Sequence, residues 1–426
     1  MPAAAQLPNM ILPCRNRGCR NHVRPFRFAL LFAACFLAPI GEAMAQYGAG
    51  STSEAAAAGG GGHVPLGIIT GVDFGYDDRV LGSNATTGTS AQGSFLLREN
   101  LVLTYDRPAE PTEVRLIGVG RFTQFLNVGT DDKDGNVTLG FTHNFSTRLS
   151  FRADLYAAYQ TEPNFQSNIG PENVRAPHFD THDIFSLSYH WLPRLSSITS
   201  YTFERVNYEQ STPTTTGIGI AQDRSQHTFA EGLQFSLTRR TNLVLQYRYL
   251  IVDYDTSPRD STTHFALAGI DHKFTEHLTV NLLGGESFRS FKDDGSSSNP
   301  NAEVRVNYQS SNHSLSWITT YGVEQSTETL AMGNTTFRTG LNAMYNLTSR
   351  INARAGVYYH HSENQGSSGT TSAGAQDALQ FTLSLKYTIN KHFATHIDYV
   401  YTSQNRSGGA ASYSRNQYFA GVTYTY

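Results

Sequence analysis

Residues 381–389 read Phe-Thr-Leu-Ser-Leu-Lys-Tyr-Thr-Ile, so that apolar side chains occupy the odd positions and polar side chains the even ones. Residues 351–360 and 151–159 alternate in the same way. A period of two places successive side chains on opposite faces of a β-strand. The sequence therefore predicts an all-β protein whose strands have one apolar and one polar face.

The length and rhythm of these segments narrow the fold class. They run for about 9–13 residues, whereas strands of globular proteins average about 5–6 and membrane-spanning strands need about 9–11. A soluble sandwich shares the alternation but turns its apolar face inward, and propeller or solenoid repeats use short strands or helices. Short turns that alternate with long polar loops are typical of outer-membrane barrels.

The segments between the turns give the strand count. We predict about eighteen antiparallel strands in an up-and-down transmembrane barrel, near 67–80, 94–106, 113–127, 137–145, 149–160, 183–192, 195–209, 227–237, 241–254, 263–274, 277–291, 302–310, 313–325, 336–347, 350–361, 378–389, 392–402 and 416–426. The predicted long loops are 82–93, 129–136, 161–181, 210–225, 255–262, 291–301, 326–335, 361–376 and 403–415. With an even number of strands, the first strand starts from the periplasmic side and the last strand returns to it.

The last strand of the chain carries a second signal. Its alternate residues are Tyr418, Ala420, Val422, Tyr424 and Tyr426. This face resembles the C-terminal signal that the outer-membrane barrel assembly machinery reads, although that signal more often ends in Phe. An aromatic end also suits the girdle at a membrane interface. An ordinary edge strand is the alternative.

The first 45 residues have the three parts of a secretory signal peptide. A basic stretch without acidic residues precedes the apolar run 28–40, and Ala43-Met44-Ala45 provides a cleavage site. One alternative is a membrane anchor helix, for which the apolar run is short. The other alternative is a lipoprotein signal, whose cysteine would be Cys35. Residues 46–66 are rich in Ala and Gly and predict a flexible periplasmic tail. We therefore divide the chain into 1–45, 46–66 and the barrel 67–426.

Removal of the signal peptide changes the composition. All three cysteines lie within it, so the mature chain has no disulfide and no Cys metal site. Five of the 32 basic residues and one of the 35 acidic residues also leave, and the mature net charge is near −7. This charge disfavours nucleic-acid binding. The tail is too short for the plug of a TonB-dependent transporter.

Charged residues in the polar phase are candidates for the wall of a pore, because a barrel of 16–18 strands leaves an aqueous channel. The basic candidates outnumber the acidic ones: Arg98, Arg115, Arg121, Arg152, Arg248, Arg305, Arg354 and Lys386 against Asp73, Asp154, Glu303 and Asp398. These charges either pair across neighbouring strands or bias the lumen toward anionic or hydroxyl-rich solutes. The alternation leaves the phase of Glu99, Arg205 and Glu286 unassigned.

No catalytic, cofactor or metal motif stands out. The histidines His143, His190, His272, His277, His313 and His392 fall at predicted turns, and no Gly-x-Ser-x-Gly motif provides a nucleophile. Residues 131–135 partly match a calcium loop, but Phe141 stands where its closing Glu is required. We expect a non-enzyme without cofactors.

The segments 235–249 and 347–359, in which a strand, a turn and a strand follow one another, resemble the units of a porin-like group called putative β-barrel porin 2. The resemblance spreads over roughly 137–426. It implies a passive pore, and because some members lie in exopolysaccharide export operons, it also implies polysaccharide as a solute.

These observations together predict a porin-like channel of the bacterial outer membrane for small solutes or polysaccharide. Its expected partners are outer-membrane lipid, lipopolysaccharide, the barrel assembly machinery and anionic or sugar solutes. The alternative is a structural or adhesive barrel that acts through its long Ser-, Thr-, Asn- and Gly-rich loops.

Overall fold

The computed structural model describes residues 66–81, 92–161, 177–209, 223–256, 259–292, 295–325, 331–366, 374–407 and 412–426. The predicted signal peptide and the predicted tail lie outside these residues, apart from Leu66, with which the first strand begins. Within the described residues, no helix is long and apolar enough to cross a membrane.

The described chain forms a single sheet of eighteen strands. They are β1 (Leu66–Leu81), β2 (Gln92–Ala109), β3 (Thr112–Phe125), β4 (Asp131–Asn144), β5 (Leu149–Gln160), β6 (His178–Leu192), β7 (Leu195–Tyr208), β8 (Arg224–Ser236), β9 (Thr241–Tyr254), β10 (Ser261–Lys273), β11 (Leu278–Phe291), β12 (Ser296–Gln309), β13 (His313–Glu324), β14 (Ala331–Asn346), β15 (Ile351–Gly366), β16 (Ala375–Thr388), β17 (Phe393–Arg406) and β18 (Tyr413–Thr425).

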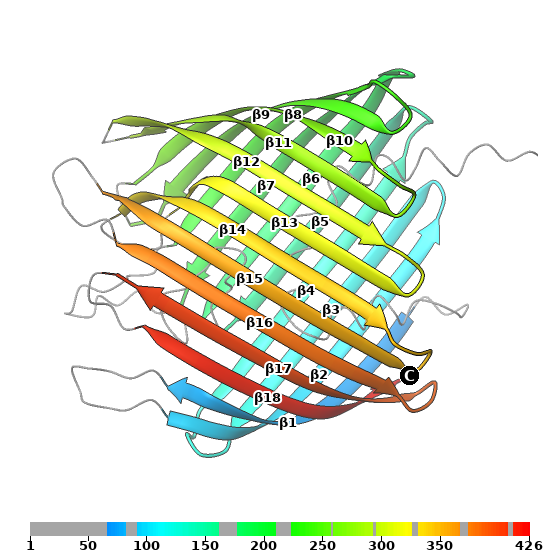
Figure 1. The fold of residues 1–426 in the computed structure, drawn as a ribbon, viewed down its shortest axis with the longest axis vertical. Coiled ribbons are helices and arrows are strands. Elements are labelled where there is room, and N and C mark those ends of the chain that lie inside the picture. Colours follow the sequence, from blue (N-terminus) through cyan, green and yellow to red (C-terminus); the bar gives the residue numbers. More distant parts are fainter. Residues whose placement is uncertain are drawn as a thin grey trace, which may run out of the picture. The chain divides into compact units, whose positions relative to one another are not determined.

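Each strand pairs antiparallel with the next strand in the chain, and β18 pairs with β1, so the sheet closes into a barrel (Figure 1). The closing ladder runs from Ile69 opposite Thr425 to Asp77 opposite Gln417. Closure leaves no strand edge with unpaired backbone groups, which is the condition for a sheet that crosses lipid. The predicted all-β antiparallel barrel of eighteen strands is confirmed.

Several strands are longer than the sequence pattern predicted. β4 begins at Asp131 and β12 at Ser296, so residues 131–136 and 296–301 of the predicted loops 129–136 and 291–301 are strand residues. These two predictions were wrong because alternation marks only the part of a strand that faces lipid. Ladder hydrogen bonds continue where both faces are polar, since they involve the backbone alone.

Pro300 lies within β12, four residues after its start at Ser296. In the structure Pro300 lies opposite Glu286 of β11, while the pairing of β12 with β13 reaches only as far as Ala302, opposite Tyr321. The first residues of β12 therefore have a neighbour on one side only. A proline is tolerated there because its missing N–H has no ladder partner to lose.

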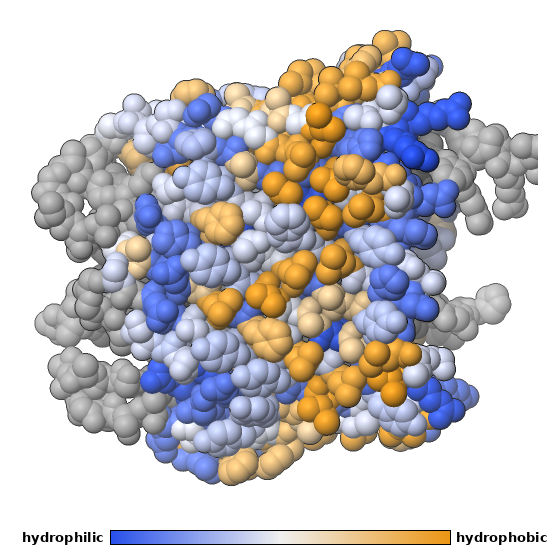
Figure 2. All heavy atoms as spheres, in the orientation of Figure 1, coloured by the Kyte–Doolittle hydropathy of each residue, from blue (hydrophilic) through white to orange (hydrophobic). Residues whose placement is uncertain are grey.

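The two faces of the sheet differ as the alternation requires. Large apolar side chains such as Phe74, Leu245 and Ile397 are exposed, and on the visible face they gather in a band nearer to the short-turn end (Figure 2). The opposite face carries most of the buried polar residues, including Asp77 and Arg289. The apolar face thus suits lipid and the polar face turns to the barrel interior.

Candidate functional site

The ladder register shows which side chains share the inner face. Residues opposite one another in neighbouring strands point to the same side, and Asp73, which is 1% exposed, lies opposite Arg98 of β2 and Gly421 of β18. Followed strand by strand, this face includes the whole set of pore-wall candidates: Asp73, Arg98, Arg115, Arg121, Arg152, Asp154, Arg248, Glu303, Arg305, Arg354, Lys386 and Asp398.

The three charged residues of unassigned phase lie on the outer face. Glu99 is opposite the exposed Val72, and Glu286 is opposite Ala266. Arg205 lies near the long-connection end and pairs with Asp255. The outer face is therefore not purely apolar toward its long-connection end.

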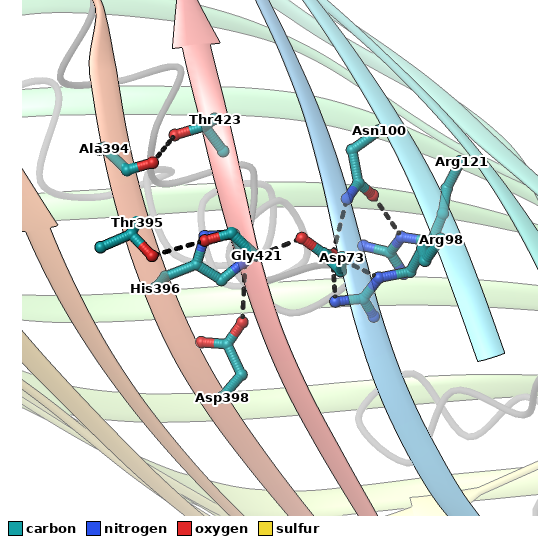
Figure 3. Close-up of polar contacts among 10 residues, drawn as sticks. All are labelled: Asp73, Arg98, Asn100, Arg121, Ala394, Thr395, His396, Asp398, Gly421 and Thr423. Atoms are coloured by element: carbon teal, nitrogen blue, oxygen red, sulfur yellow. Dashed lines mark hydrogen bonds and ion pairs between the residues drawn. The ribbon is translucent and has the colours of Figure 1, made fainter. Parts of the chain in front are cut away.

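A largely buried network of side chains from β1, β2 and β17 crosses the junction between the first and last strands and is called here the seam cluster (Figure 3). Asp73 of β1 accepts hydrogen bonds from Arg98 at 2.7 Å and from Asn100 at 2.8 Å, both on β2. On its other side Asp73 lies 3.0 Å from Nε2 of His396 on β17. That imidazole also approaches Asp398 at 3.5 Å.

Gly421 makes this contact across β18 feasible. It lies directly between Asp73 and His396 in the ladder, and Figure 3 shows the two side chains reaching toward each other past it. A Cβ at position 421 would lie 2.0 Å from Oδ1 of Asp73 and 2.8 Å from Cε1 of His396. The glycine thus provides the space in which an acid on β1 meets a base on β17.

A second buried pair lies further along the same seam. Asp77, 0% exposed, accepts hydrogen bonds at 3.0 Å from Nε of Arg415 on β18 to both carboxylate oxygens. Gln417 donates a further bond of 3.1 Å to Asp77. Beside it, Arg98 lies 3.8 Å over the ring of Phe419, which packs with Val80 and Leu96 in a small apolar cluster. The seam is therefore closed by charges and by apolar contacts.

A different arrangement lines β9–β12. Arg248 of β9 donates to Glu303 of β12 at 2.6 Å and 3.2 Å, although β10 and β11 lie between them. Arg248 also donates to Gln246 at 2.7 Å. Both side chains keep about a quarter of their surface exposed, at 24% and 27%. This pair is therefore partly hydrated, unlike the pairs of the seam.

The remaining predicted residues are placed by register. Arg152 of β5 pairs with Asp154 at 2.5 Å. Arg115 is exposed near the short-turn end and lies opposite Gly140. Arg354 lies opposite Ser384, and Lys386 opposite His396.

The sequence analysis missed several inner-face residues on the opposite side of the barrel. Across β6, β7 and β8, His182 lies 3.0 Å from Glu204, which accepts a bond of 3.1 Å from Gln226. Glu324 of β13 pairs with Arg338 of β14. Glu324 also interacts electrostatically with Glu204 and with Arg224 of β8. Strands that are not neighbours thus bring their charges together inside the barrel.

Arg289 of β11 is another missed residue, and it is 1% exposed. Its guanidinium donates to Ser261 of β10 at 3.0 Å and to the carbonyl oxygen of Glu324 at 3.2 Å. It also donates to Gln325. These contacts fix the inner surface at the long-connection end of β10–β13.

The missed residues share the parity of residues that were predicted. His396 precedes Asp398 by two positions, and Asp77 follows Asp73 by four, so the same alternation marks them. Arg415 fell within a predicted loop. The inner face gains the acids Asp77, Asp180, Glu204, Asp271 and Glu324 and also the bases Arg224, Arg289, Arg338 and Arg415, so the added charges nearly balance.

The inner wall therefore offers paired charges, amides and hydroxyls rather than one reactive centre. Among the described residues, no group of three or more His, Cys, Asp or Glu side chains could hold a metal ion. Alternating donors and acceptors can exchange hydrogen bonds with water and with polar solutes along the wall.

Comparison with known proteins gave three kinds of result. No curated protein sequence matches the chain at a significant level. Among solved structures, OccAB4 of Acinetobacter baumannii is 10% identical with a TM-score of 0.41, covering 85% of this chain and 99% of that chain. OccK1 (OpdK) of Pseudomonas aeruginosa is 14% identical with a TM-score of 0.41, covering 85% and 98%. The FrpB iron transporter of Neisseria meningitidis is 10% identical with a TM-score of 0.44, covering 87% and 83%. The family model described as "Putative beta-barrel porin 2" matches residues 127–426.

Proposed function

The chain belongs to the family described as "Putative beta-barrel porin 2", and on this premise we propose that it is a passive channel for small polar solutes. The family match covers most of the barrel, in agreement with the resemblance that the sequence carried. The protein is an outer-membrane barrel of bacteria.

The inner wall is the observation that carries the proposal. The sheet is closed, it has eighteen strands, and its inner face is lined with charged and polar side chains. A barrel of 16–18 strands is too wide for its own side chains to fill and leaves an aqueous channel. A polar wall around such a channel favours the passage of hydrated solutes.

The nature of the solute follows from the pairing of the wall charges. Arg248 with Glu303 and Arg152 with Asp154 neutralise each other and leave donors and acceptors side by side. Such a wall suits sugars and other hydroxyl-rich molecules, and it favours weak rather than strong ion selectivity. Longer polysaccharide, which the family resemblance implies, is the extension of this proposal.

Single-channel conductance of the refolded mature protein in a planar bilayer tests the proposal. We expect stable open steps and a reversal potential close to zero in a KCl gradient. Silence from protein that is inserted and folded would contradict a passive channel. Liposome swelling with oligosaccharides of increasing length then measures the largest sugar that passes.

We propose further that the barrel acts without catalysis, because many of its described inner charges, among them Asp73, Asp77 and Glu303, are engaged in ion pairs and hydrogen bonds. Hydrolase assays on phospholipid and lipopolysaccharide test this, and turnover by purified folded protein would refute it.

The C-terminal face supports recognition by the barrel assembly machinery. Tyr418 and Val422 are exposed on the outer face of β18, Tyr424 shares that face, and Tyr426 is exposed directly after the strand. Because β18 is also a closing strand, its recognition would bring the last strand to the membrane before closure. We expect a Tyr424→Ala, Tyr426→Ala variant to accumulate unassembled in the periplasm. The long-connection end is the side that we propose contacts lipopolysaccharide.

A further inference from the structure

The short turns of the barrel repeat one structure. Five of them have an apolar residue, then Ser, Thr or Asn, then any residue, then Arg or His: 145–148, 237–240, 274–277, 347–350 and 389–392. In the first, the hydroxyl of Ser146 accepts bonds from the backbone N–H groups of Arg148 at 3.2 Å and Leu149 at 3.0 Å. A side chain that caps its own turn in this way fixes the turn conformation.

The other four turns follow the same scheme. Thr238 caps Arg240 at 3.1 Å, and Thr348 caps Arg350 at 3.2 Å. In the two histidine turns, Thr275 caps His277 at 3.2 Å and Asn390 caps His392 at 2.8 Å. The basic residue therefore occupies the same position in every copy.

Each basic residue is also tied to the next hairpin by its carbonyl oxygen. The carbonyl of Arg148 accepts a bond of 2.9 Å from His190, and that of Arg194, in the turn between β6 and β7, accepts one of 2.8 Å from Ser236. The same contact recurs at 2.8–2.9 Å for the remaining turns, with the donors Lys273, Gln309, Thr388 and Thr425. The turns thus form a rim in which one hairpin holds the next.

The side chains of this rim form a ring of positive charge. The exposed arginines and lysine at the turn tips are Arg148, Arg194, Arg239, Arg240, Arg350 and Lys391. In the short turns, all of which the structure describes, the carboxylate side chains are Glu276 and Glu110, the latter between β2 and β3. The described part of the opposite end mixes acids, namely Glu209, Asp223, Asp255 and Asp260, with bases that include Lys133 and Lys292. The short-turn rim is therefore the basic end of the barrel.

The apolar residues next to the ring indicate its position relative to the membrane. Phe145, Trp191 and Phe274 are more than half exposed at the base of their turns, and Leu347 and Ile389 take the same place in theirs. Exposed aromatic and aliphatic side chains at a barrel end lie at the membrane interface. The basic side chains, three residues further on at most, then stand at the level of lipid headgroups.

We propose that this ring binds the phosphates of anionic phospholipid headgroups in the leaflet at the short-turn end, which is the periplasmic leaflet. Guanidinium groups bind phosphate through paired hydrogen bonds. The fixed turns hold these groups at one level, so that a lipid phosphate meets a prepared site between adjacent tips. The proposal concerns the outer rim and does not depend on conduction through the barrel.

The chain carries its own reporter for this contact. It has two tryptophans, and Trp191 adjoins Leu192 and Arg194 at the rim. A Trp317→Phe background leaves Trp191 as the sole tryptophan. The parent protein and its variants are refolded into phosphatidylcholine vesicles. The vesicles contain, at the same mole fraction, either brominated phosphatidylglycerol or brominated phosphatidylcholine. Brominated lipid chains quench the fluorescence of nearby tryptophan.

We expect brominated phosphatidylglycerol to quench Trp191 more strongly than brominated phosphatidylcholine. One nearby basic residue corresponds to roughly five-fold enrichment of an anionic lipid. The excess quenching of Trp191 by brominated phosphatidylglycerol should decline in high salt. An Arg148→Gln, Arg194→Gln variant removes the two nearest charges and should abolish most of the excess. The cap of the 145–148 turn remains in this variant, because Ser146 accepts from the backbone N–H of residue 148 and not from its side chain.

A Lys133→Gln, Lys292→Gln variant is the matched control. It removes two exposed positive charges from the long-connection end and should retain the excess. Equal quenching by both lipids in the parent protein would overturn the proposal and direct attention to an acidic protein partner. Equal losses in the two double variants would also overturn it, because the attraction would then be a property of total charge. Unchanged conductance of the Arg148→Gln, Arg194→Gln variant separates this test from that of the channel.

Discussion

Two stretches of the inner wall use ion pairs in different ways. At the seam between β1 and β18, Asp77 and Asp73 are 0% and 1% exposed and meet partners from β2, β17 and β18. On the wall of β9–β12, Arg248 and Glu303 remain about one quarter exposed. Ion pairs of the same residue types are therefore buried at the seam and partly hydrated on the wall of β9–β12.

The difference reflects what each stretch has to join. Asp77 and Arg415 are separated by 338 positions in the chain, and bringing such distant ends together carries the entropy of a long loop. The seam ladder is also shorter than the ladder of β1 with β2, which extends from Leu66 to Leu81. Buried charges add contacts at the one junction that turns the sheet into a barrel. The partly exposed pair of Arg248 and Glu303 does not join the two ends of the sheet, and it faces the barrel interior.

Removal of a seam base is the sharpest test of this contrast. An Arg415→Met substitution leaves the carboxylate of Asp77 buried without its main partner, which costs about 3–5 kcal/mol of unfolding free energy. Arg248→Met, the matched change on the wet wall, should cost at most about 1 kcal/mol because Glu303 is hydrated. Denaturant unfolding of protein in lipid, followed by heat-modifiable electrophoretic mobility, measures both. Similar losses for the two variants would refute the contrast.

Gly421 allows a smaller perturbation of the same seam. Gly421→Ala would place a Cβ against Asp73 and His396, and we expect a loss of about 1–3 kcal/mol from the forced displacement. Gly120→Ala is the control, because no atom lies within 4 Å of the added Cβ. That variant should stay within about 0.5 kcal/mol of the parent protein. Equal stability of the two variants would show that the contact across β18 is dispensable.

Ion selectivity should change more with a substitution on the wall of β9–β12 than with one at the seam, which is the opposite of the order expected for stability. Glu303→Gln removes a partly hydrated acid from the wet wall, so the permeability ratio should move toward anions by roughly two-fold. Asp77→Asn, in those molecules that fold, should leave the ratio unchanged because the carboxylate is buried. Reversal potentials in a KCl gradient provide the comparison. A larger shift for Asp77→Asn than for Glu303→Gln would reverse our assignment of the two stretches.

The weakest effect is expected for a pair on the outer face. Arg205 donates to Asp255, just beyond the end of β9, and lowers the pKa of that carboxyl below its ordinary value. A lowered pKa means that the stabilisation is present above the unfolded pKa and is lost as the pH falls through the folded one. Because Asp255 is 41% exposed, Asp255→Asn should cost well under about 1 kcal/mol at neutral pH. Unfolding curves at neutral and acidic pH would show a difference between parent and variant only at the former.

The residue pattern predicted which segments are strands and on which face of the sheet a residue lies. It did not predict where the strands begin and end. The alternation in 381–389 assigned Lys386 to the inner face because lipid admits only one arrangement of a two-sided strand. The start of β4 at Asp131 escaped the pattern, since polar residues on both faces carry no period. Four histidines that were predicted to lie at turns are strand residues for the same reason: His143, His190, His272 and His313.

The sequence by itself determined the barrel, its number of strands and the face of the twelve charged residues that it assigned to the pore wall. A period of two decides the side of a strand, and membrane lipid decides which side is apolar. Only the tertiary structure decided which acid meets which base. His396 reaches Asp73 past a glycine, and Arg248 crosses two strands to Glu303. Such contacts depend on the register and curvature of the closed sheet, and no alternation within one strand contains that information.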